Sequence, residues 1–449
     1  MNEKKKLNLF QINYLGIGFV VYTIARLVSK RNFGSILFFN IVDYSGEIQI
    51  IINKTCLEFE FFIVSKKVCV GDILFVKGIT VLNNNNKKCV LAKVISIVSK
   101  NYLYFPDKYH KVKHNISKNY VFDFYLNSNK YSKILFRSSF IREIRNYMHF
   151  KNFVELETPI LNNITGGALV SEFETFHNFY KRKMYLRVSP EIYLKKALIC
   201  GFDNIFEIGK NFRNENISKN HYPEFTSMEF YISYKNYKYS MHFLENMIKR
   251  LFFNLLKSNI LFYDNYELNL NSNFKKMTFL ECILKYDNSE NISNINNICF
   301  LKSFLFSKFN DLDKSILKSD NLSIFQYLYF DKFISKKIFF PTFVTNQPRY
   351  FSPLAKSKLS NCNFVERFEL FMFGKEVADG FSELNDFVEQ KAIFEAQSLK
   401  TGKKIDESFL NLMKFGMPFS TGCGVGIDRL LMILTNSLNI KDVLFFKHN

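Results

Sequence analysis

Residues 206–231 constrain this chain most, because they predict two strands that share a strongly polar face. Successive side chains of a strand point to opposite faces, so residues two apart lie on one face. The residues with this spacing are Asn211, Arg213 and Glu215 in the first segment, and Phe225, Ser227, Glu229 and Tyr231 in the second. Turn-forming residues 216–221 join the segments. A solvated polar face is the ordinary explanation of such a hairpin, so the rest of the chain decides whether this face is a site.

Residues 15–106 predict a small β-barrel. Five short segments rich in β-branched and aromatic residues (20–28, 35–43, 48–53, 72–82 and 90–98) alternate with turn signals, and residues 55–66 leave room for one helix. Oligonucleotide-binding barrels have this make-up, and a generic small barrel is the alternative. Three basic residues, Arg26, Lys30 and Arg31, lie before a turn. An aromatic residue, Phe38, and an amide, Gln49, follow on the next two strands. Such a face can stack on exposed bases and hydrogen-bond to them.

The formal net charge of +20 points to a polyanionic partner, with nucleic acid as the first candidate. The chain is also rich in Lys, Asn, Ile, Phe and Tyr and contains no Trp. An AT-rich coding sequence would produce the same bias and would raise the charge without selection for binding. The two explanations have roughly even weight on this ground.

The cysteines and the N-terminus indicate a cytosol-like compartment. The 8 cysteines are scattered without a C-x-x-C pair, which favours reduced thiols and predicts no zinc site. The first ten residues carry lysines but no apolar core of a secretory signal. No apolar run approaches the roughly 20 residues of a membrane span. We therefore expect a soluble, cytoplasmic protein.

The pattern changes to mixed helix and strand after a basic, broken linker at residues 107–130. An amphipathic helix is predicted from Tyr131 to just before Asn152, then a strand over residues 153–161 and a turn at Gly166 and Gly167. Further helices are expected at residues 191–199 and 241–258. Residues 259–340 are rich in Asn and Ser, with one helical stretch near 324–333, and carry no motif.

The last third of the chain places carboxylates on apolar strands. Glu369 and Glu376 lie on either side of a turn at Gly374, and Asp379, Phe381 and Glu383 share one strand face. After a helix at residues 386–398, the chain closes with a glycine-rich strand that enters a helix carrying Arg429 in its first turn. This glycine-rich turn is not a dinucleotide fingerprint, because no βαβ unit follows it.

Two arginines and two glutamates suggest a nucleotide site. Arg213 and Arg429 could hold the phosphates of a nucleoside triphosphate, since guanidinium groups match phosphate geometry. Glu369 and Glu376 could hold its magnesium ions through carboxylate oxygens. Buried Arg–Glu pairs that simply join strands are the alternative, and each residue taken singly favours that alternative.

Taken together, these segments resemble the class II aminoacyl-tRNA synthetases, and within them the lysyl-tRNA synthetase family. FRSSFIREIRNYMHFKNFVELETPIL looks like motif 1 of the class, FRNENISKNHYPEFTSMEFY like motif 2 and GCGVGIDRLLMIL like motif 3. LRVSPEIYLKKALI, EFTSMEFYISY and DGFSELND resemble the lysine family more than its aspartate and asparagine relatives. The resemblance covers roughly residues 15–446, and its motifs occur in order at compatible spacing.

The resemblance implies an α+β protein with two domains. Residues 1–106 would form a five-stranded OB-fold barrel that binds the anticodon, through Arg31, Phe38 and Gln49. Residues 131–449 would form a class II catalytic domain, an antiparallel sheet flanked by helices, with 259–340 as a variable region. Motif 1 would build a homodimer interface. The partners implied are tRNA(Lys), L-lysine and ATP, with Mg²⁺ as cofactor.

The resemblance also implies a role for each site residue. Arg213 would bridge the α-phosphate of ATP and the amino acid carboxylate, and Arg213 and Arg429 would be the catalytic cations. The residues implied to bind ATP are Arg213, Glu215, His221, Phe225 and Arg429. Those implied to bind lysine are Gly166, Gly167, Glu191, Glu229, Tyr231, Asp379, Phe381 and Glu383. Glu369 and Glu376 would hold magnesium.

Two other functions compete with lysine activation. A synthetase for aspartate would need cations around the side chain of its substrate, whereas Glu229 and Glu383 supply the opposite charge. A non-catalytic RNA-binding relative would be expected to lose Arg213, Arg429 or the two magnesium-binding glutamates, and none is lost. Asp379 departs from the family, which usually has asparagine there, and so adds a third acid near the substrate.

Overall fold

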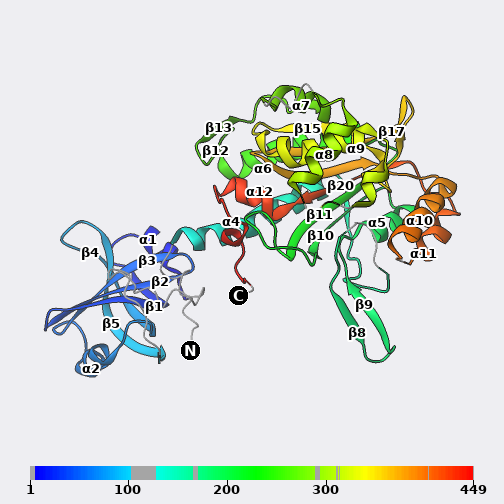
Figure 1. Cartoon of the computed structure of the whole chain (residues 1–449). Helices are drawn as coiled ribbons and strands as arrows, with labels where there is room; N and C mark the ends of the chain where they lie inside the picture. The colour runs from blue at the N-terminus through cyan, green and yellow to red at the C-terminus, as the bar shows by residue number, and fades with distance from the viewer. Residues whose placement is uncertain are drawn as a thin grey trace. The chain divides into compact units, whose positions relative to one another are not determined.

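The computed structural model describes residues 6–102, 128–164, 170–288, 294–309, 312, 314–402 and 404–447. The chain divides into two compact units, Met1–Ser132 and Lys133–Asn449, each with its own core (Figure 1). The expected linker at 107–130 lies almost entirely outside the described residues. Among those that are described, no helix is both long and apolar enough to cross a membrane.

The first unit is a closed barrel in which the strands follow the order β1-β2-β3-β5-β4. Its elements are α1 (Leu9–Tyr14), β1 (Val20–Asn32), β2 (Ile36–Asp43), β3 (Gly46–Asn53), α2 (Phe59–Lys67), β4 (Ile73–Leu82) and β5 (Lys88–Ser99). All pairings are antiparallel except β3 with β5. The five strands and the helix between the third and the fourth were both predicted, and the barrel confirms them.

Alternation of apolar and polar residues closes this barrel around a continuous core. Leu37, Phe39 and Ile41 of β2 are fully buried, whereas Phe38 between them is partly exposed on the outer surface. Gly78 allows β4 and β5 to approach closely, because a Cβ atom there would lie 2.3 Å from the carbonyl oxygen of Leu91. The pairing register shifts at this glycine, which bends the strand as barrel closure requires.

The second unit is built on an eight-stranded sheet in the order β14-β15-β18-β19-β20-β11-β10-β6. Its strands are β6 (Val154–Glu155), β10 (Asn204–Phe212), β11 (Glu224–Ser233), β14 (Lys275–Thr278), β15 (Thr342–Thr345), β18 (Arg367–Met372), β19 (Lys375–Ser382) and β20 (Ser420–Gly426). The six central strands are antiparallel, as expected. The two edge pairs, β10 with β6 and β14 with β15, are parallel, so the complete sheet is mixed.

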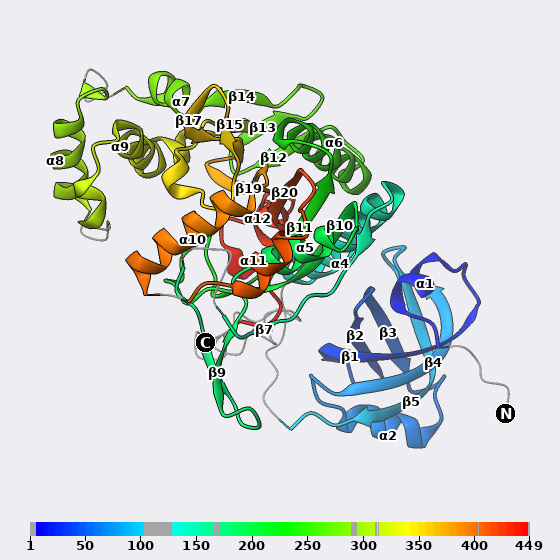
Figure 2. The same ribbon diagram turned by 90° about the vertical axis from the view of Figure 1, so that its right-hand side faces the viewer.

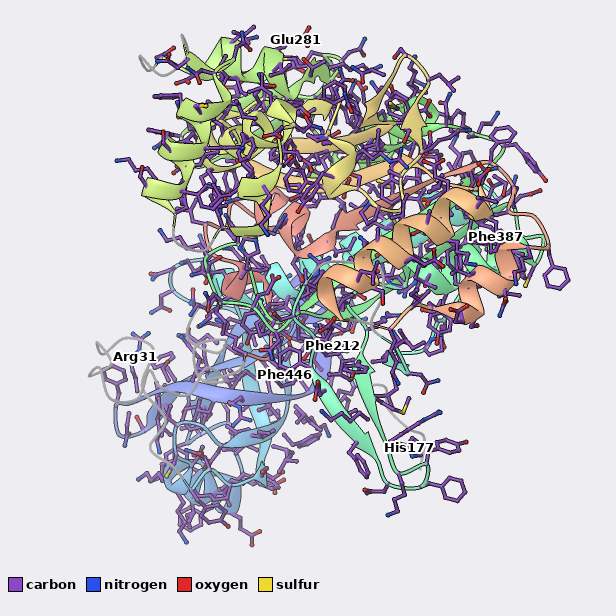
Figure 3. All side chains as sticks on the ribbon, turned by 45° about the vertical axis from the view of Figure 1, so that its right-hand side comes forward. Arg31, His177, Phe212, Glu281, Phe387 and Phe446 are labelled. Carbon is purple, nitrogen blue, oxygen red and sulfur yellow. The ribbon has the colours of Figure 1, made fainter. Side chains whose placement is uncertain are left out.

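Helices cover both faces of this sheet. They are α4 (Ser128–Phe150), α5 (Glu191–Ile199), α6 (Tyr237–Leu256), α7 (Phe279–Tyr286), α8 (Ile298–Lys308), α9 (Leu322–Tyr329), α10 (Phe387–Thr401), α11 (Glu407–Met413) and α12 (Ile427–Leu434). One small sheet consists of β7 (Leu161–Asn162), β8 (Glu174–His177) and β9 (Arg182–Leu186), and its β8–β9 hairpin turns just after His177 (Figure 3). Two further small sheets pair β12 (Ile260–Tyr263) with β13 (Tyr266–Asn269), and β16 (Ser357–Lys358) with β17 (Asn361–Val365).

The period of two along β11 separates the core from the site. Met228, Phe230 and Ile232 pack into the core with α4, α6 and α12. The intervening Glu229 and Tyr231 face the other side, where α5, α10 and α11 form a second cluster. Figure 1 shows α6 and α12 apart from α10 and α11, as these two clusters require.

Residues 259–340 form a third apolar cluster, although they carry no motif. Helices α7, α8 and α9 gather beside β14 and β15 (Figures 1 and 2). Buried rings dominate their contacts, including Phe279, Phe325 and Phe330. A π-helical turn, Phe330–Ile334, follows α9, so the helix expected near 324–333 changes geometry at its end.

Two expected strands differ from the structure. The strand predicted over 153–161 consists of two separate pieces, β6 in the main sheet and β7 in the small sheet, because Pro159 between them lacks the N–H that a continuous strand needs. The first strand of the hairpin ends at Phe212, so Arg213 and Glu215 lie in the loop rather than on the strand. The amide of Arg213 still bonds to the carbonyl of Pro223 at 2.9 Å, which extends the pairing by one step.

Candidate functional site

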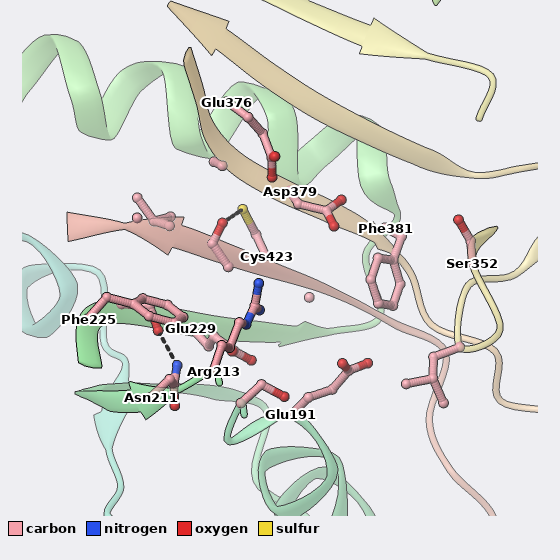
Figure 4. A pocket seen from close by; sticks show the side chains of 18 of the residues that line it. Glu191, Asn211, Arg213, Phe225, Glu229, Ser352, Glu376, Asp379, Phe381 and Cys423 are labelled. Atoms are coloured by element: carbon pink, nitrogen blue, oxygen red, sulfur yellow. Dashed lines mark hydrogen bonds between the residues drawn. The ribbon is translucent and has the colours of Figure 1, made fainter. Parts of the chain in front are cut away.

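A cavity of about 550 Å³ opens over the polar face of β11, β19 and β20. Figure 4 shows side chains from several elements converging on it, among them Glu191, Arg213 and Asp379. The predicted site residues that line it are Glu191, Arg213, Glu215, His221, Phe225, Glu229, Tyr231, Glu376, Asp379, Phe381 and Arg429. Residues more than 200 positions apart in the sequence therefore meet at one cavity, as the family resemblance implied.

One end of the cavity carries two arginines and an aromatic ring. The guanidinium of Arg213 lies over the ring of Phe225, 5.1 Å from its centroid. Arg429 donates to the carbonyl of Glu376 at 2.6 Å and lies 3.1 Å from Nε2 of His221. Partial desolvation, followed by the nearby Arg429 cation, lowers the pKa of His221, so the ring is neutral at neutral pH. This end offers fixed cations for an anion and a flat apolar surface for a planar group.

The other end of the cavity is acidic. Glu229 is 9% exposed and accepts a hydrogen bond of 3.2 Å from the hydroxyl of Tyr231. Burial, followed by the charge of Glu191, raises the pKa of Glu229 to about 8. A carboxylate that is desolvated in this way gains most when a cation binds beside it.

Glu383 lies in the same cluster but is already paired with a lysine. The ammonium of Lys195, on α5, lies 2.7 Å from Oε1 of Glu191 and 2.6 Å from Oε2 of Glu383. Burial raises the pKa of Glu383 to about 8, and Lys195 opposes that shift. Within the described residues, both carboxylate oxygens of Glu383 are buried and neither has a hydrogen-bond partner. The acidic end thus keeps carboxylate oxygens that one internal cation does not satisfy.

Glycines of β20 make room for this end of the cavity. Gly422, Gly424 and Gly426 all face it. A Cβ atom on Gly422 would lie 2.4 Å from Oε1 of Glu383 and 2.4 Å from Cε1 of Tyr231. The glycine-rich segment therefore removes side chains from the cavity floor.

Asp379 is neutralised by an arginine that the sequence pattern did not single out. Arg367 on β18 binds both carboxylate oxygens of Asp379, each at 2.8 Å. The same guanidinium contacts Ser352 at 2.7 Å and Glu369 at 3.0 Å. The third acid near the predicted substrate site therefore adds little net charge to the cavity.

The two predicted metal ligands differ in their surroundings. Glu369 is buried, accepts a 2.6 Å hydrogen bond from Tyr327, and does not line the cavity. Burial raises its pKa to about 8, against the influence of Arg367. Glu376 is partly exposed and lies 3.7 Å from Arg429. The described residues contain no group of three or more His, Cys, Asp or Glu that could hold a metal, so an ion bound here needs ligand oxygens from a substrate as well.

A buried junction joins the three motif segments beneath the cavity. Arg137 of α4 donates to Asp428 of α12 and, at 2.9 Å, to the hydroxyl of Thr226 on β11. Asp428 also accepts from the backbone amide of Thr226 at 2.7 Å. This junction fixes the first turn of α12, and with it Arg429, relative to the hairpin.

The barrel places its three predicted residues on one outer face. Arg31 pairs directly with Phe38, and Phe38 with Ile51, which is two residues from Gln49. Lys30, expected on the same face, points the other way and caps α2 by donating to the carbonyls of Lys66 and Val68. Arg26 likewise donates to the carbonyl of Gly71 at 2.7 Å. The basic face is therefore smaller than the sequence suggested.

Several residues of the site were not predicted from the sequence, and the predicted glycine turn is not among the residues that the structure describes. Gly166 and Gly167 lie outside the described residues. Lys195, Arg367, Tyr327 and Arg137 were not predicted as site residues, because an isolated Lys or Arg on a helix or strand usually lies at the surface. The one available signal was the spacing of Glu191 and Lys195, an i,i+4 pair.

Comparison with known proteins agrees with this geometry. Residues 113–449 match the family described as tRNA synthetases class II (D, K and N), and residues 21–98 match the OB-fold nucleic acid binding domain. The first match covers the cavity and all three motif segments, and the second covers the barrel face.

Individual relatives extend along nearly the whole chain. A Lysine–tRNA ligase of Buchnera aphidicola subsp. Cinara cedri is 42% identical over 99% of this chain and 88% of its own length. One from Buchnera aphidicola subsp. Schizaphis graminum is 38% identical over 97% of this chain and 88% of its own. A third, from Aromatoleum aromaticum, is 34% identical over 94% and 85%.

Proposed function

The chain belongs to the class II tRNA synthetases, in the family of lysine–tRNA ligases, and we propose that its cavity activates L-lysine with ATP and transfers the lysyl group to the 3′ end of tRNA(Lys). The single observation that carries this proposal is the polarity of the cavity. Two arginines lie at one end, and Glu191, Glu229 and Tyr231 line the other, where the buried Glu383 lies beside Gly422 of the cavity wall.

Charge balance supports lysine as the amino acid. The three carboxylates carry three negative charges when ionised, and Lys195 supplies one positive charge. Free lysine brings two ammonium groups, which would leave the acidic end neutral. A neutral or acidic side chain would leave buried carboxylates unpaired, at a cost of several kcal/mol. In our assignment Glu229, Tyr231 and Glu383 bind the ε-ammonium and Glu191 the α-ammonium. Phe381 packs beside the alkyl chain, and Gly166 and Gly167, which lie outside the described residues, keep the lysine-binding role that the resemblance implies.

The proposed first step needs no covalent bond to the enzyme. The lysine carboxylate attacks the α-phosphorus of ATP in line, the bond to the β-phosphate oxygen breaks, and pyrophosphate leaves with its electron pair. Arg213 bridges the carboxylate and the α-phosphate, and Arg429 stabilises the charge that develops on the phosphates. Phe225 and Arg429 sandwich the adenine, with Glu215 and His221 at its edge. A ribose hydroxyl at the 3′ end of the tRNA then accepts the lysyl group and AMP leaves.

Glu369 and Glu376 are our candidates for Mg²⁺ ligands. Carboxylate oxygens are the donors that Mg²⁺ prefers, and few protein ligands suit an ion that is also bound by substrate phosphates. A bound ion would neutralise the charge of the triphosphate. Ionisation of Glu369, whose pKa burial raises to about 8, would be favoured by such a cation.

We assign the outer face of the barrel to the anticodon. Arg31 is exposed and lies next to Phe38, an arrangement that suits stacking on unpaired bases. Gln49 would supply hydrogen bonds to a base edge. We also propose that the chain acts in the cytoplasm as a homodimer through α4 and the segment that follows it, as the motif 1 resemblance implies.

The decisive experiment is ATP–pyrophosphate exchange with a panel of amino acids. Exchange should depend on lysine and should not respond to aspartate or asparagine. Equal stimulation by aspartate would refute the assignment. Glu383→Gln should raise KM for lysine at least about tenfold while KM for ATP stays within about twofold, because it removes one carboxylate from the acidic end. An equal rise in both constants would contradict the placement of Glu383.

A further inference from the structure

The ammonium of Lys195 occupies a position that neither the motifs nor the family resemblance explained. Lys195 is 1% exposed, on the inner face of α5. Its ammonium lies between Glu191 and Glu383, at 2.7 and 2.6 Å, and 5.3 Å from the centroid of the Phe381 ring. A fully buried lysine is rare in proteins and is stable only when it is paired.

We propose that Lys195 is a positioning residue for lysine recognition, which holds Glu383 by one oxygen and leaves the other oxygen for the ε-ammonium of the substrate. The inference rests on the proposed function and deepens it. The ion pair with Lys195 runs through Oε2 of Glu383, at 2.6 Å, and neither carboxylate oxygen makes a hydrogen bond within the described residues. Oε1 lies over Gly422, on the floor of the cavity, where an added Cβ atom would meet it at 2.4 Å.

Electrostatics explain why Glu383 needs an internal cation. Buried carboxylates close together do not all stay ionised, because each raises the pKa of its neighbours. The charged and titratable groups around Lys195 are Glu191 on α5, Glu229 and Tyr231 on β11, Asp379 on β19, and Glu383 just after it. Asp379 is already paired with Arg367. Lys195 is therefore the counter-ion of the remaining acids in the empty site.

The same cation sets how many ammonium groups the site can accept. With Lys195 in place, the three acids require two further positive charges, which is the number that free lysine carries. Without Lys195, one more acid would take a proton and would then offer a hydroxyl in place of an acceptor oxygen. The loss would fall on lysine binding and would leave the arginine end, where ATP is assigned, unchanged.

The test compares Lys195→Met with Lys196→Met in the full chain. Lys196 is the next residue on α5 and pairs with Asp406 at 3.6 Å outside the cluster. Lys195→Met should raise KM for lysine about tenfold or more, keep KM for ATP within about twofold, and move the pH of half-maximal lysine affinity upward by about one unit. Lys196→Met should change none of these quantities. Lys195→Arg, which retains the charge, should keep the wild-type pH profile.

A double variant keeps the inference testable if Lys195→Met is poorly folded. Glu383→Gln and the combination K195M/E383Q complete a cycle in which the combination removes one charge of each sign. If Lys195 acts through Glu383, the second substitution adds little to the loss of lysine affinity caused by E383Q. Additive losses, or an unshifted pH profile in Lys195→Met, would overturn the inference. So would tighter lysine binding, because it would make Lys195 a competitor of the substrate.

The two proposals fail in different ways. If the wild-type chain shows no lysine-dependent exchange, the proposed function is wrong. If the wild-type chain exchanges normally and Lys195→Met behaves like Lys196→Met, only the role of Lys195 is wrong.

Discussion

At the scale of single residues, the acidic end should make lysine binding depend on pH. Burial raises the pKa of Glu229 and of Glu383 to about 8, so both carry a proton part of the time at neutral pH. Lysine binds the ionised carboxylates. Its dissociation constant should therefore fall several-fold as the pH rises from about 6.5 to about 8, and binding should release protons. Calorimetry in buffers of different ionisation enthalpy measures that release, and an uptake of protons would contradict the assignment.

The same residues give a stability effect of defined sign. An ordinary glutamate pKa is 4.5, whereas Glu229 and Glu383 reach about 8 in the folded chain. The folded state therefore binds more protons than the unfolded state between these values. These two glutamates therefore stabilise the folded state fully when the pH is below their pKa in the unfolded chain. This stabilisation is lost as the pH rises through their pKa in the folded chain. Chemical denaturation measures the free energy of unfolding at pH 6 and at pH 8. Its decrease between these pH values should be smaller in Glu229→Gln than in the wild type.

Gly422 offers a second test at this scale. A Cβ atom there would overlap Glu383 and Tyr231 at 2.4 Å, whereas one on Gly424 would meet its nearest neighbour, Glu229, at 3.7 Å, an ordinary contact. Gly422→Ala should raise KM for lysine about tenfold or more, because it displaces the side chains that we assign to the ammonium. Gly424→Ala should have a smaller effect. Exchange kinetics at varied lysine and at varied ATP separate the two variants, and equal effects would contradict this geometry.

The sequence predicted which residues line the cavity better than it predicted their pairing. Period-two spacing placed Glu229 and Tyr231 on one face, and the cavity confirms it. The same spacing could not reveal that Lys195 turns inward to Glu383, which is distant in sequence. Nor could it reveal that Arg367 pairs with Asp379, because that contact depends on how β18 and β19 pair. Long-range ion pairs depend on tertiary packing, and a single sequence carries no signal for them.

At the scale of elements, the junction of Arg137, Thr226 and Asp428 should hold α12 in place. Arg137→Met leaves the buried carboxylate of Asp428 without its cation, so the free energy of unfolding should fall by about 3–5 kcal/mol. Arg142→Met, at an exposed position of the same helix, should change it by less than about 0.5 kcal/mol. Urea denaturation checks both variants. A change below about 1 kcal/mol for Arg137→Met would show that the junction is not a stabilising element.

Elements with a clear period were predicted well, and short ones were not. Helix α10 begins after Asp386, whose side chain caps it by accepting from the amide of Glu389 at 2.8 Å. The hairpin of β18 and β19 turns at Gly374, where φ is +66° and a Cβ atom would lie 2.5 Å from the carbonyl oxygen of Lys336. The two-residue strands β6 and β7 could not be predicted, because each is defined only by its hydrogen bonds to a different sheet.

At the scale of the whole molecule, the two compact units divide the proposed function. Each unit has its own apolar core, and all the described residues that line the cavity belong to the second unit. Amino acid activation should therefore not depend on the side chains of the barrel. The transfer step needs the tRNA, and its rate should depend on them. The net charge of +20 fits such a partner. Arg31 and Phe38, on the outer face of the barrel, are the residues whose substitution tests recognition of the tRNA.

Arg31→Ala and Phe38→Ala should separate the two steps. Each should lower kcat/KM for tRNA charging about tenfold or more, because loss of a stacked ring or a base contact costs about 1–3 kcal/mol. Lysine-dependent exchange should stay within about twofold of the wild type. Lys67→Ala removes one exposed charge at the end of α2. It should affect charging far less than Arg31→Ala, because a single exposed charge that contacts no base contributes little once salt screens it. Equal losses in Lys67→Ala and Arg31→Ala would mean that net charge, rather than the face of Arg31 and Phe38, recognises the tRNA.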